Sequence, residues 1–292
     1  MKLTTDRPLT LFDLVMEKLK PGSKNRGKQI VQYSLIELNG TATNDPRTLV
    51  NPGDVVTLER NQTPVRKIKP PFPILFEDEH LLVAEKPPGI LTHGVGESNW
   101  KSFFGMLAAY INEMTKEREH LFIVHRLDKE VTGLLIFAKS LEIQEYFKTH
   151  WKTVEKLYCA LVEHAPPQPE GTLESWLHEH PKSLKVSSGP QRPFAKFAVT
   201  HYRTLSQEGE YTLLEIKLDT GRKNQIRVQL SDMGCPIVGD FRYGADDTVK
   251  RQIRLCAYSL TFPHPVTGKV ISLQIKLPKS FLNPSSVDEY YK

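Results

Sequence analysis

The sequence predicts an α+β fold in which a small α/β module precedes a larger domain built on a mixed, largely antiparallel sheet. The chain has 292 residues, which suffices for such a module and a domain of more than about two hundred residues. Short β-rich runs separated by turns fill the chain from Ile74 onward, and helical spacing of apolar residues is clear there only at 100–115 and 141–151. Before residue 60, two helical stretches precede two short strands.

The first module is expected at residues 1–60. An amphipathic stretch at 9–19, LTLFDLVMEKL, is followed by a loop and by a second helical stretch near 29–34. The strands LIELNG and VVTLER come next, with turns at Asn39-Gly40 and at 51–54. This order resembles the small RNA-binding module first seen in ribosomal protein S-four, which implies that residues 1–60 bind RNA.

The segment 61–73 contains four prolines and several basic residues, and is predicted to be a linker because it cannot sustain a helix or a central strand. Residues 74–292 then form the second domain. Its expected strands lie in the runs PILFEDEHLLVAEKP, IVHRLD, GLLIFAKS, KLYCALVEH, FAVTHYRTL, YTLLEIKL, YSLTFPHP and KVISLQIKL.

The composition is that of a soluble, mildly basic protein. The net charge is +5 and the pI is about 8.9, and basic residues gather in several patches, which favours a polyanionic partner. No segment approaches the roughly 20 apolar residues of a membrane span, and we read no signal peptide, so a cytoplasmic protein is expected. The three cysteines lack the paired spacing of a zinc site.

Three motifs are given their simpler interpretation. Residues 22–29, GSKNRGKQ, have the spacing of a phosphate-binding loop, but Gln29 replaces the magnesium-binding Ser or Thr, so a basic loop is expected. The run 178–180, His-Glu-His, offers two metal ligands without a third, which favours a surface loop and no metal. HRLD at 125–128 is similar to a kinase catalytic loop, but its Asp is displaced and the other kinase elements are missing.

The segment HRLDKEVTGLLIFAKS is more informative as a whole. A strand is expected to deliver His125, Arg126 and Leu127 to a turn that presents Asp128 among basic neighbours, and an apolar strand from Gly133 returns the chain to the core. An Asp in a turn is, taken alone, usually a turn former.

Four ordered segments and the chain's closing strand together resemble the RluA-type pseudouridine synthases. They are ILFEDEHLLVAEKPPGILTH, HRLDKEVTGLLIFAKS, VEKLYCALVEH, LDTGRKNQIRVQLSDMGCPIVGDFRYG and RLCAYSLTFPHPVTGK, and they extend from about 74 to 278. The resemblance implies the pseudouridine synthase fold, with Asp128 as catalytic carboxylate, Tyr158 as active-site tyrosine, Arg227 as active-site arginine and Leu255 lining the base pocket. Asn224, Val131 and Cys256 depart from the family's usual His, Thr and His.

The implied reaction breaks the bond between ribose and the base nitrogen, turns the base and rejoins it through carbon 5, and it needs no cofactor. Asp128 would attack the anomeric carbon or the base ring, or remove a sugar proton. Arg227 would hold the carboxylate ionised, and Tyr158 would stack on the detached uracil. Substrate contacts are expected from His125, Arg126, Leu127, Lys196, Arg222, Gln225 and Leu255.

The expected partner is structured RNA, which a monomer would bind after splaying out the target uridine. Large-subunit ribosomal RNA is the first choice because of the N-terminal module, and transfer RNA is the second. A protein that keeps the fold without the reaction, such as a ribosome-assembly factor, is the alternative from another class.

Overall fold

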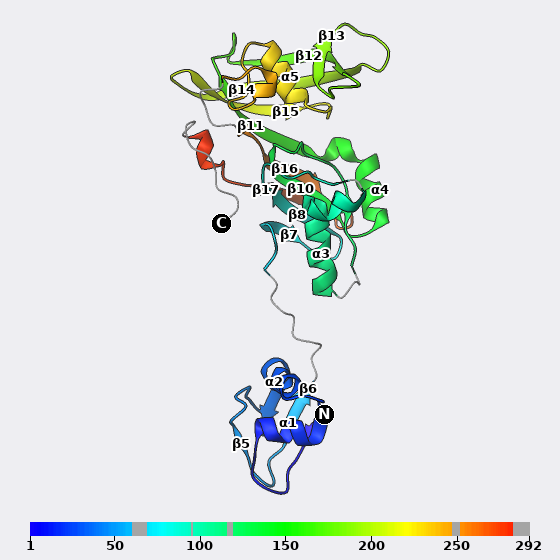
Figure 1. The fold of residues 1–292 in the computed structure, drawn as a ribbon, viewed down its shortest axis with the longest axis vertical. Coiled ribbons are helices and arrows are strands. Elements are labelled where there is room, and N and C mark those ends of the chain that lie inside the picture. Colours follow the sequence, from blue (N-terminus) through cyan, green and yellow to red (C-terminus); the bar gives the residue numbers. More distant parts are fainter. Residues whose placement is uncertain (60–68, 95, 116–118, 247–251, 283–292) are drawn as a thin grey trace. The chain divides into compact units, whose positions relative to one another are not determined.

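A computed structural model describes residues 1–59, 69–94, 96–115, 119–246 and 252–282. The chain divides into two compact units, 1–69 and 70–292, which are described separately (Figure 1). Most of the expected linker lies outside the described residues. Its last part, however, belongs to the second unit, because Phe72 is buried there and its ring centroid lies 4.6 Å from that of Phe103.

The first unit packs two helices against a four-stranded sheet with the order β1-β6-β3-β4. Its elements are β1 Lys2–Leu3, β2 Leu9–Thr10, α1 Leu11–Leu19, α2 Lys24–Tyr33, β3 Leu35–Leu38, β4 Thr41–Ala42, β5 Leu49–Val50 and β6 Val56–Glu59. Helix α2 begins five residues before the expected position, since the Ser23 hydroxyl accepts from the Arg26 amide at 3.2 Å and caps it. The basic loop expected at 22–29 is therefore mostly helix.

The second unit is built on one large sheet with the order β13-β12-β14-β15-β11-β16-β10-β8-β7. Outside this order, β17 pairs with β16 and β9 pairs with β10. Every described pair is antiparallel except β10 with β16, which confirms the mixed, largely antiparallel fold. The strands are β7 Ile74–Glu77, β8 Leu81–Lys86, β9 Phe122–Ile123, β10 Thr132–Ala138, β11 Glu155–Glu163, β12 Glu170–Glu179, β13 Val186–Gly189, β14 Lys196–Glu208, β15 Tyr211–Leu218, β16 Leu255–Pro263 and β17 Val270–Gln274.

Helices cover parts of this sheet: α3 and α4 lie beside β8 and β10, and α5 lies beside β12 and β14 (Figure 1). They are α3 Phe103–Thr115, α4 Leu141–Thr149 and α5 Gln225–Asp232, with short 3-10 turns η1 Gly96–Lys101, η2 Trp151–Thr153, η3 Phe241–Tyr243 and η4 Lys279–Phe281. Among the described residues no helix is long and apolar enough to cross a bilayer.

The structure departs from the sequence prediction in four further places. Helix α5 was not predicted, and neither were β12 and β13, whose exposed polar residues hide the strand pattern. The strand expected to carry His125 ends at Ile123, so 124–128 approaches the site as loop. The run 178–180 is not a surface loop: His178 is buried in β12, where its Nδ1 accepts from Arg192 Nε at 2.8 Å.

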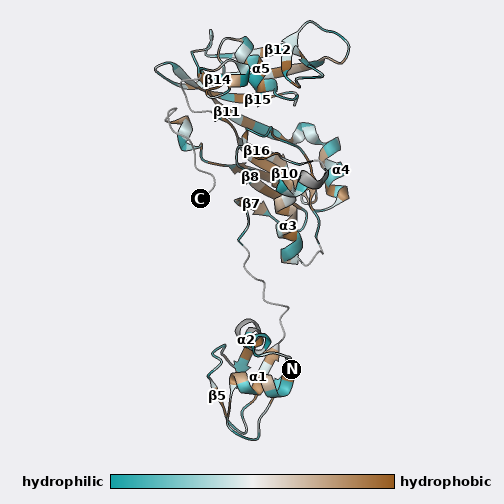
Figure 2. Ribbon diagram, in the orientation of Figure 1, coloured by the Kyte–Doolittle hydropathy of each residue, from teal (hydrophilic) through white to brown (hydrophobic). Residues whose placement is uncertain are grey.

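Strand β10 forms the centre of the second unit, and all seven of its residues are buried between two apolar clusters. Figure 2 shows this apolar centre in brown at β8 and β10. Gly133 allows β10 to lie against β16: its φ is +126°, and a Cβ there would stand 2.3 Å from the Ala257 carbonyl oxygen. The close approach places the loop before β10 beside the start of β16.

Candidate active site

The loop 124–131 holds Asp128 in a fixed backbone conformation. On one side, the Thr92 hydroxyl donates to the Leu127 carbonyl at 2.7 Å and accepts from the Leu127 amide at 3.1 Å. On the other side, the Gly89 amide donates to the Lys129 carbonyl at 2.8 Å. The turn after β8 therefore clamps the residues before and after Asp128, so the carboxylate starts from a rigid base.

Lys86 reinforces this clamp from inside the protein. Its side chain is fully buried, and its ammonium donates to the carbonyls of Pro87 at 2.8 Å, Ile90 at 3.0 Å and Lys129 at 3.1 Å. Burial lowers the pKa of Lys86 to about 7, against the raising effect of Glu130 and Asp128. In the sequence, Lys86 appeared only within the resembling segment ILFEDEHLLVAEKPPGILTH, which does not indicate that it supports the loop.

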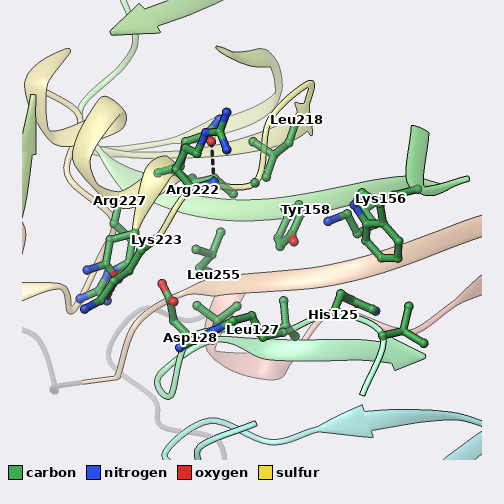
Figure 3. A pocket seen from close by; sticks show the side chains of 18 of the residues that line it. His125, Leu127, Asp128, Lys156, Tyr158, Leu218, Arg222, Lys223, Arg227 and Leu255 are labelled. Carbon is green, nitrogen blue, oxygen red and sulfur yellow. Dashed lines mark hydrogen bonds between the residues drawn. The ribbon is translucent and has the colours of Figure 1, made fainter. Parts of the chain in front are cut away.

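A cavity of about 480 Å³ opens above this loop and brings together most of the predicted site (Figure 3). Nine of the ten residues singled out from the sequence line it: His125, Arg126, Leu127, Asp128, Tyr158, Arg222, Gln225, Arg227 and Leu255. The tenth, Lys196, is exposed at the start of β14 and does not line the cavity. Other lining residues are Val124, Val131, Phe147, Lys148, Trp151, Lys156, Leu218, Gly221, Lys223, Asn224 and Ile226.

Asp128 is mostly buried, and its environment acts on its charge in two directions. Burial raises the pKa of Asp128, while the Arg227 guanidinium, and then Arg126, the Asn224 backbone amide and Lys223, lower it. Burial prevails, so the pKa stays above its ordinary value. The nearby cations therefore offset only part of the desolvation cost of the charged carboxylate.

Arg227 makes its direct ion pair with Asp240, which sequence reasoning did not identify. Its Nε and Nη2 donate to the two Asp240 oxygens at 2.6 and 2.9 Å, and its Nη1 donates to Asn224 Oδ1 at 3.1 Å. The guanidinium carbon lies 4.9 Å from the Tyr243 ring centroid. Both charged side chains are buried, so Arg227 is oriented by Asp240 and acts on Asp128 through its field. The only signal for Asp240 was its place in the resembling segment PIVGDFRYG.

Tyr158 forms one wall of the cavity from β11. Burial, and next the charge of Asp128, raise the pKa of the Tyr158 hydroxyl well above its ordinary value. The phenol therefore stays protonated at neutral pH and offers a flat apolar surface with a hydroxyl donor.

Two neighbouring residues shape the cavity from the start of α5. Asn224 adopts the left-handed conformation, with φ at +54°, and its Nδ2 donates to the Tyr243 hydroxyl at 3.0 Å. Gln225 makes four hydrogen bonds within the protein, including donation to the Val199 carbonyl and acceptance from the Arg222 amide. Its polar side-chain atoms are thus engaged within the protein, and the substrate contact predicted for this buried residue stays a prediction.

His125 lies at the other end of the cavity in a neutral form. Its Nε2 accepts from the Ile136 amide at 3.0 Å, so the ring proton is on Nδ1. Burial, followed by the charge of Lys156, holds the pKa of His125 well below its ordinary value. No group of three or more potential metal-binding side chains occurs in the described parts of the chain.

Comparisons with known proteins identify the family of this chain. Residues 80–232 match the family described as RNA pseudouridylate synthase. An uncharacterised RNA pseudouridine synthase of Synechocystis sp. is 32% identical over 91% of this chain and 84% of its own length. Ribosomal large subunit pseudouridine synthase D of Xanthomonas campestris is 32% identical over 92% of this chain and 86% of its own.

Among solved structures, human RNA pseudouridylate synthase domain containing 4 is 29% identical, with a TM-score of 0.58 over 72% of this chain and 90% of that chain. The family match covers more than half of the chain and contains Asp128, Tyr158 and Arg227. The chain therefore belongs to the RNA pseudouridylate synthase family, as its resemblance to the RluA-type enzymes predicts, and it is an isomerase of RNA.

Proposed function

We propose that this enzyme isomerises specific uridines of large-subunit ribosomal RNA, with Asp128 as the nucleophile. The observation that carries the proposal is the cavity itself: Asp128 is the one carboxylate among the described residues that line it. The backbone beside Asp128 is fixed by the Thr92 hydroxyl, and the positive charge of Arg227 acts on its desolvated carboxylate. A carboxylate in that position can attack a flipped nucleotide.

The geometry supports a division of roles. A uridine turned out of the RNA would lay its base on Tyr158 and against Leu255, with its ribose toward Asp128. Asp128 then attacks the anomeric carbon or the ring, or removes a sugar proton, and the base turns and rejoins through carbon 5. Because Tyr158 stays protonated, the regenerated Asp128 carboxylate is the better base for the final proton at carbon 5.

The choice of RNA rests on two supports. The Xanthomonas relative is named for the large ribosomal subunit, and its match spans 92% of this chain, which is more than the second unit alone. The N-terminal unit also resembles the RNA-binding module of a ribosomal protein. Transfer RNA remains the second candidate, and a non-catalytic role is disfavoured because Asp128, Tyr158 and Arg227 share one cavity.

Pseudouridine mapping tests the proposal. Ribosomal and transfer RNA from cells lacking the protein are compared with RNA from cells that carry the wild type or Asp128→Asn. We expect a position in large-subunit RNA to lose pseudouridine, and only the wild type to restore it. Loss confined to transfer RNA would refute the ribosomal target, and restoration by Asp128→Asn would refute the nucleophile.

A further inference from the structure

The cavity has a second polar end that the proposed chemistry leaves unused. Figure 3 shows Asp128 and Arg227 on one side of Tyr158, and Lys156 with His125 on the other. Lys156 precedes Tyr158 by two residues in β11, so both side chains leave the same face of the strand. The tyrosine ring therefore lies between a carboxylate and an ammonium group that border one cavity.

Lys156 has no anionic partner within the described residues. Its Nζ lies 4.8 Å from the centroid of the Trp151 ring, which braces the side chain at the cavity wall. Lys148, another cation on the wall, is already paired with Glu145 at 3.0 Å. Burial lowers the pKa of Lys156 to about 8, and no opposite charge among the described residues offsets this desolvation. An acceptor supplied by a ligand would reduce this desolvation cost.

His125 has an unsatisfied donor that is buried beside the same end of the cavity. Its ring centroid lies 4.9 Å from that of Trp151, and its Nε2 is occupied by the Ile136 amide. The remaining Nδ1–H has no partner in the part of the chain that the structure describes. The polar side chains that the structure describes at this end thus offer donors and no free acceptor, which suits a carbonyl oxygen and disfavours an amino group.

We propose that Lys156 donates a hydrogen bond to a carbonyl oxygen on the far edge of the target uracil and so selects uracil over cytosine. The inference rests on the proposed function, because it needs the ribose at Asp128 and the base on Tyr158. In that pose the edge of the base remote from the sugar points toward Lys156. Uracil presents the O4 acceptor there, where cytosine presents an amino donor. The ammonium also stabilises negative charge that develops on the uracil oxygens when the glycosidic bond breaks.

Replacement of Lys156 in the full-length enzyme tests the contact. The RNA substrate is the one found by mapping, and turnover is read by tritium release from carbon 5. Lys156→Met should lower kcat by about a hundredfold, as loss of one oxyanion donor does, with a smaller change in KM. The kcat of Lys156→Arg should be at least tenfold higher than that of Lys156→Met. Lys152→Met, which removes an exposed charge beside Trp151 from outside the cavity, is the matched control and should change kcat less than twofold.

The pH profile gives a readout that a structural role would not move. Titratable groups that line the cavity with Lys156 include His125 from the loop before β10, whose pKa the charge of Lys156 lowers, Tyr158 on its own strand and Lys148 from α4. Activity of the wild type should fall above about pH 8 as Lys156 loses its proton. Lys156→Arg should extend the alkaline limb to higher pH, because guanidinium stays charged.

Substrate analogues identify the oxygen. A 4-thiouridine at the target should slow the wild type at least tenfold but leave Lys156→Met unchanged, since the two changes remove the same contact. If 4-thiouridine slows both enzymes equally, or if Lys156→Met lowers only the salt dependence of RNA binding, Lys156 is a backbone contact and the proposal is overturned. A wild type inactive on every mapped RNA refutes the proposed function instead. In that case, the contact itself is tested separately by following the pKa of Lys156 by NMR. RNA with uridine at the bound position should raise this pKa, and the same RNA with cytidine there should not.

Discussion

Arg227→Met should both destabilise the second unit and raise the pH at which activity is lost on the acid side. The substitution keeps most of the side-chain volume but removes the guanidinium, which makes two bonds to Asp240 and one to Asn224. It also removes the cation that lowers the pKa of Asp128 more than any other group. Asp128 should then hold its proton to a higher pH, so the acid limb of the pH–rate profile moves upward.

The size of the stability effect follows from the burial of the pair. The Asp240 side chain is 1% exposed and the Arg227 side chain 8%, so removing one partner leaves a desolvated charge. Such a break costs about 3–5 kcal/mol of unfolding free energy. Asp240→Asn, which keeps one acceptor, should cost less. The double variant removes both charges and should be more stable than the sum of the single losses predicts, by at least about 2 kcal/mol.

Urea unfolding of the wild type, both single variants and the double variant measures the coupling, and tritium release across pH measures the acid limb. Asp240→Asn retains the Arg227 cation, so its acid limb should not move upward. Additive losses within about 0.5 kcal/mol would show that the pair contributes no coupling. An unchanged acid limb in Arg227→Met would show that Arg227 contacts RNA without tuning Asp128.

Three further outcomes follow from other contacts. The pKa of His125 is lower in the folded state than in the unfolded chain, so its contribution to stability is complete above about pH 6.5 and is lost as the pH falls below that value. His125→Gln should therefore reduce the slope of the unfolding free energy against pH, measured by urea unfolding, by up to about 1.4 kcal/mol per pH unit. Gly133→Ala should lower the unfolding free energy by more than about 3 kcal/mol in the same assay, because its Cβ meets the Ala257 carbonyl. Gly209→Ala, whose Cβ has nothing within 4 Å, should lower it by about 1 kcal/mol, and equal losses would contradict the close-approach argument. Asn224→His should change kcat less than about a hundredfold, since the backbone amide that faces Asp128 is kept, and a larger change would place the side chain in the reaction.

The ordered motifs predicted which distant residues share a cavity, because they name residues by family position. Asp128, Tyr158 and Arg227 meet in one cavity, which no local pattern requires. Helix α5 was missed for a physical reason: Ile226, Val228 and Leu230 alternate with polar residues as in a strand. The intervening polar side chains are also buried and hydrogen-bonded, so burial does not follow the helical period.

Side-chain partners distant in the sequence were also beyond prediction. The Arg227 pair with Asp240 depends on how α5 packs near η3, and that packing has no short-range signature. The strand expected at IVHRLD stops early because the Thr92 side chain, rather than a neighbouring strand, takes the backbone hydrogen bonds of Leu127.

The position of β16 has a consequence for how the enzyme is made. This strand comes late in the sequence but sits between β11 and β10, so the two halves of the sheet stay unjoined until it is inserted. During synthesis, Asp128 and Tyr158 leave the ribosome long before Leu255 does. Such pairing between distant segments folds slowly. An unfinished chain therefore carries Asp128 and Tyr158 without the Leu255 side of their cavity, and the cavity is complete only when nearly the whole polypeptide has been synthesised.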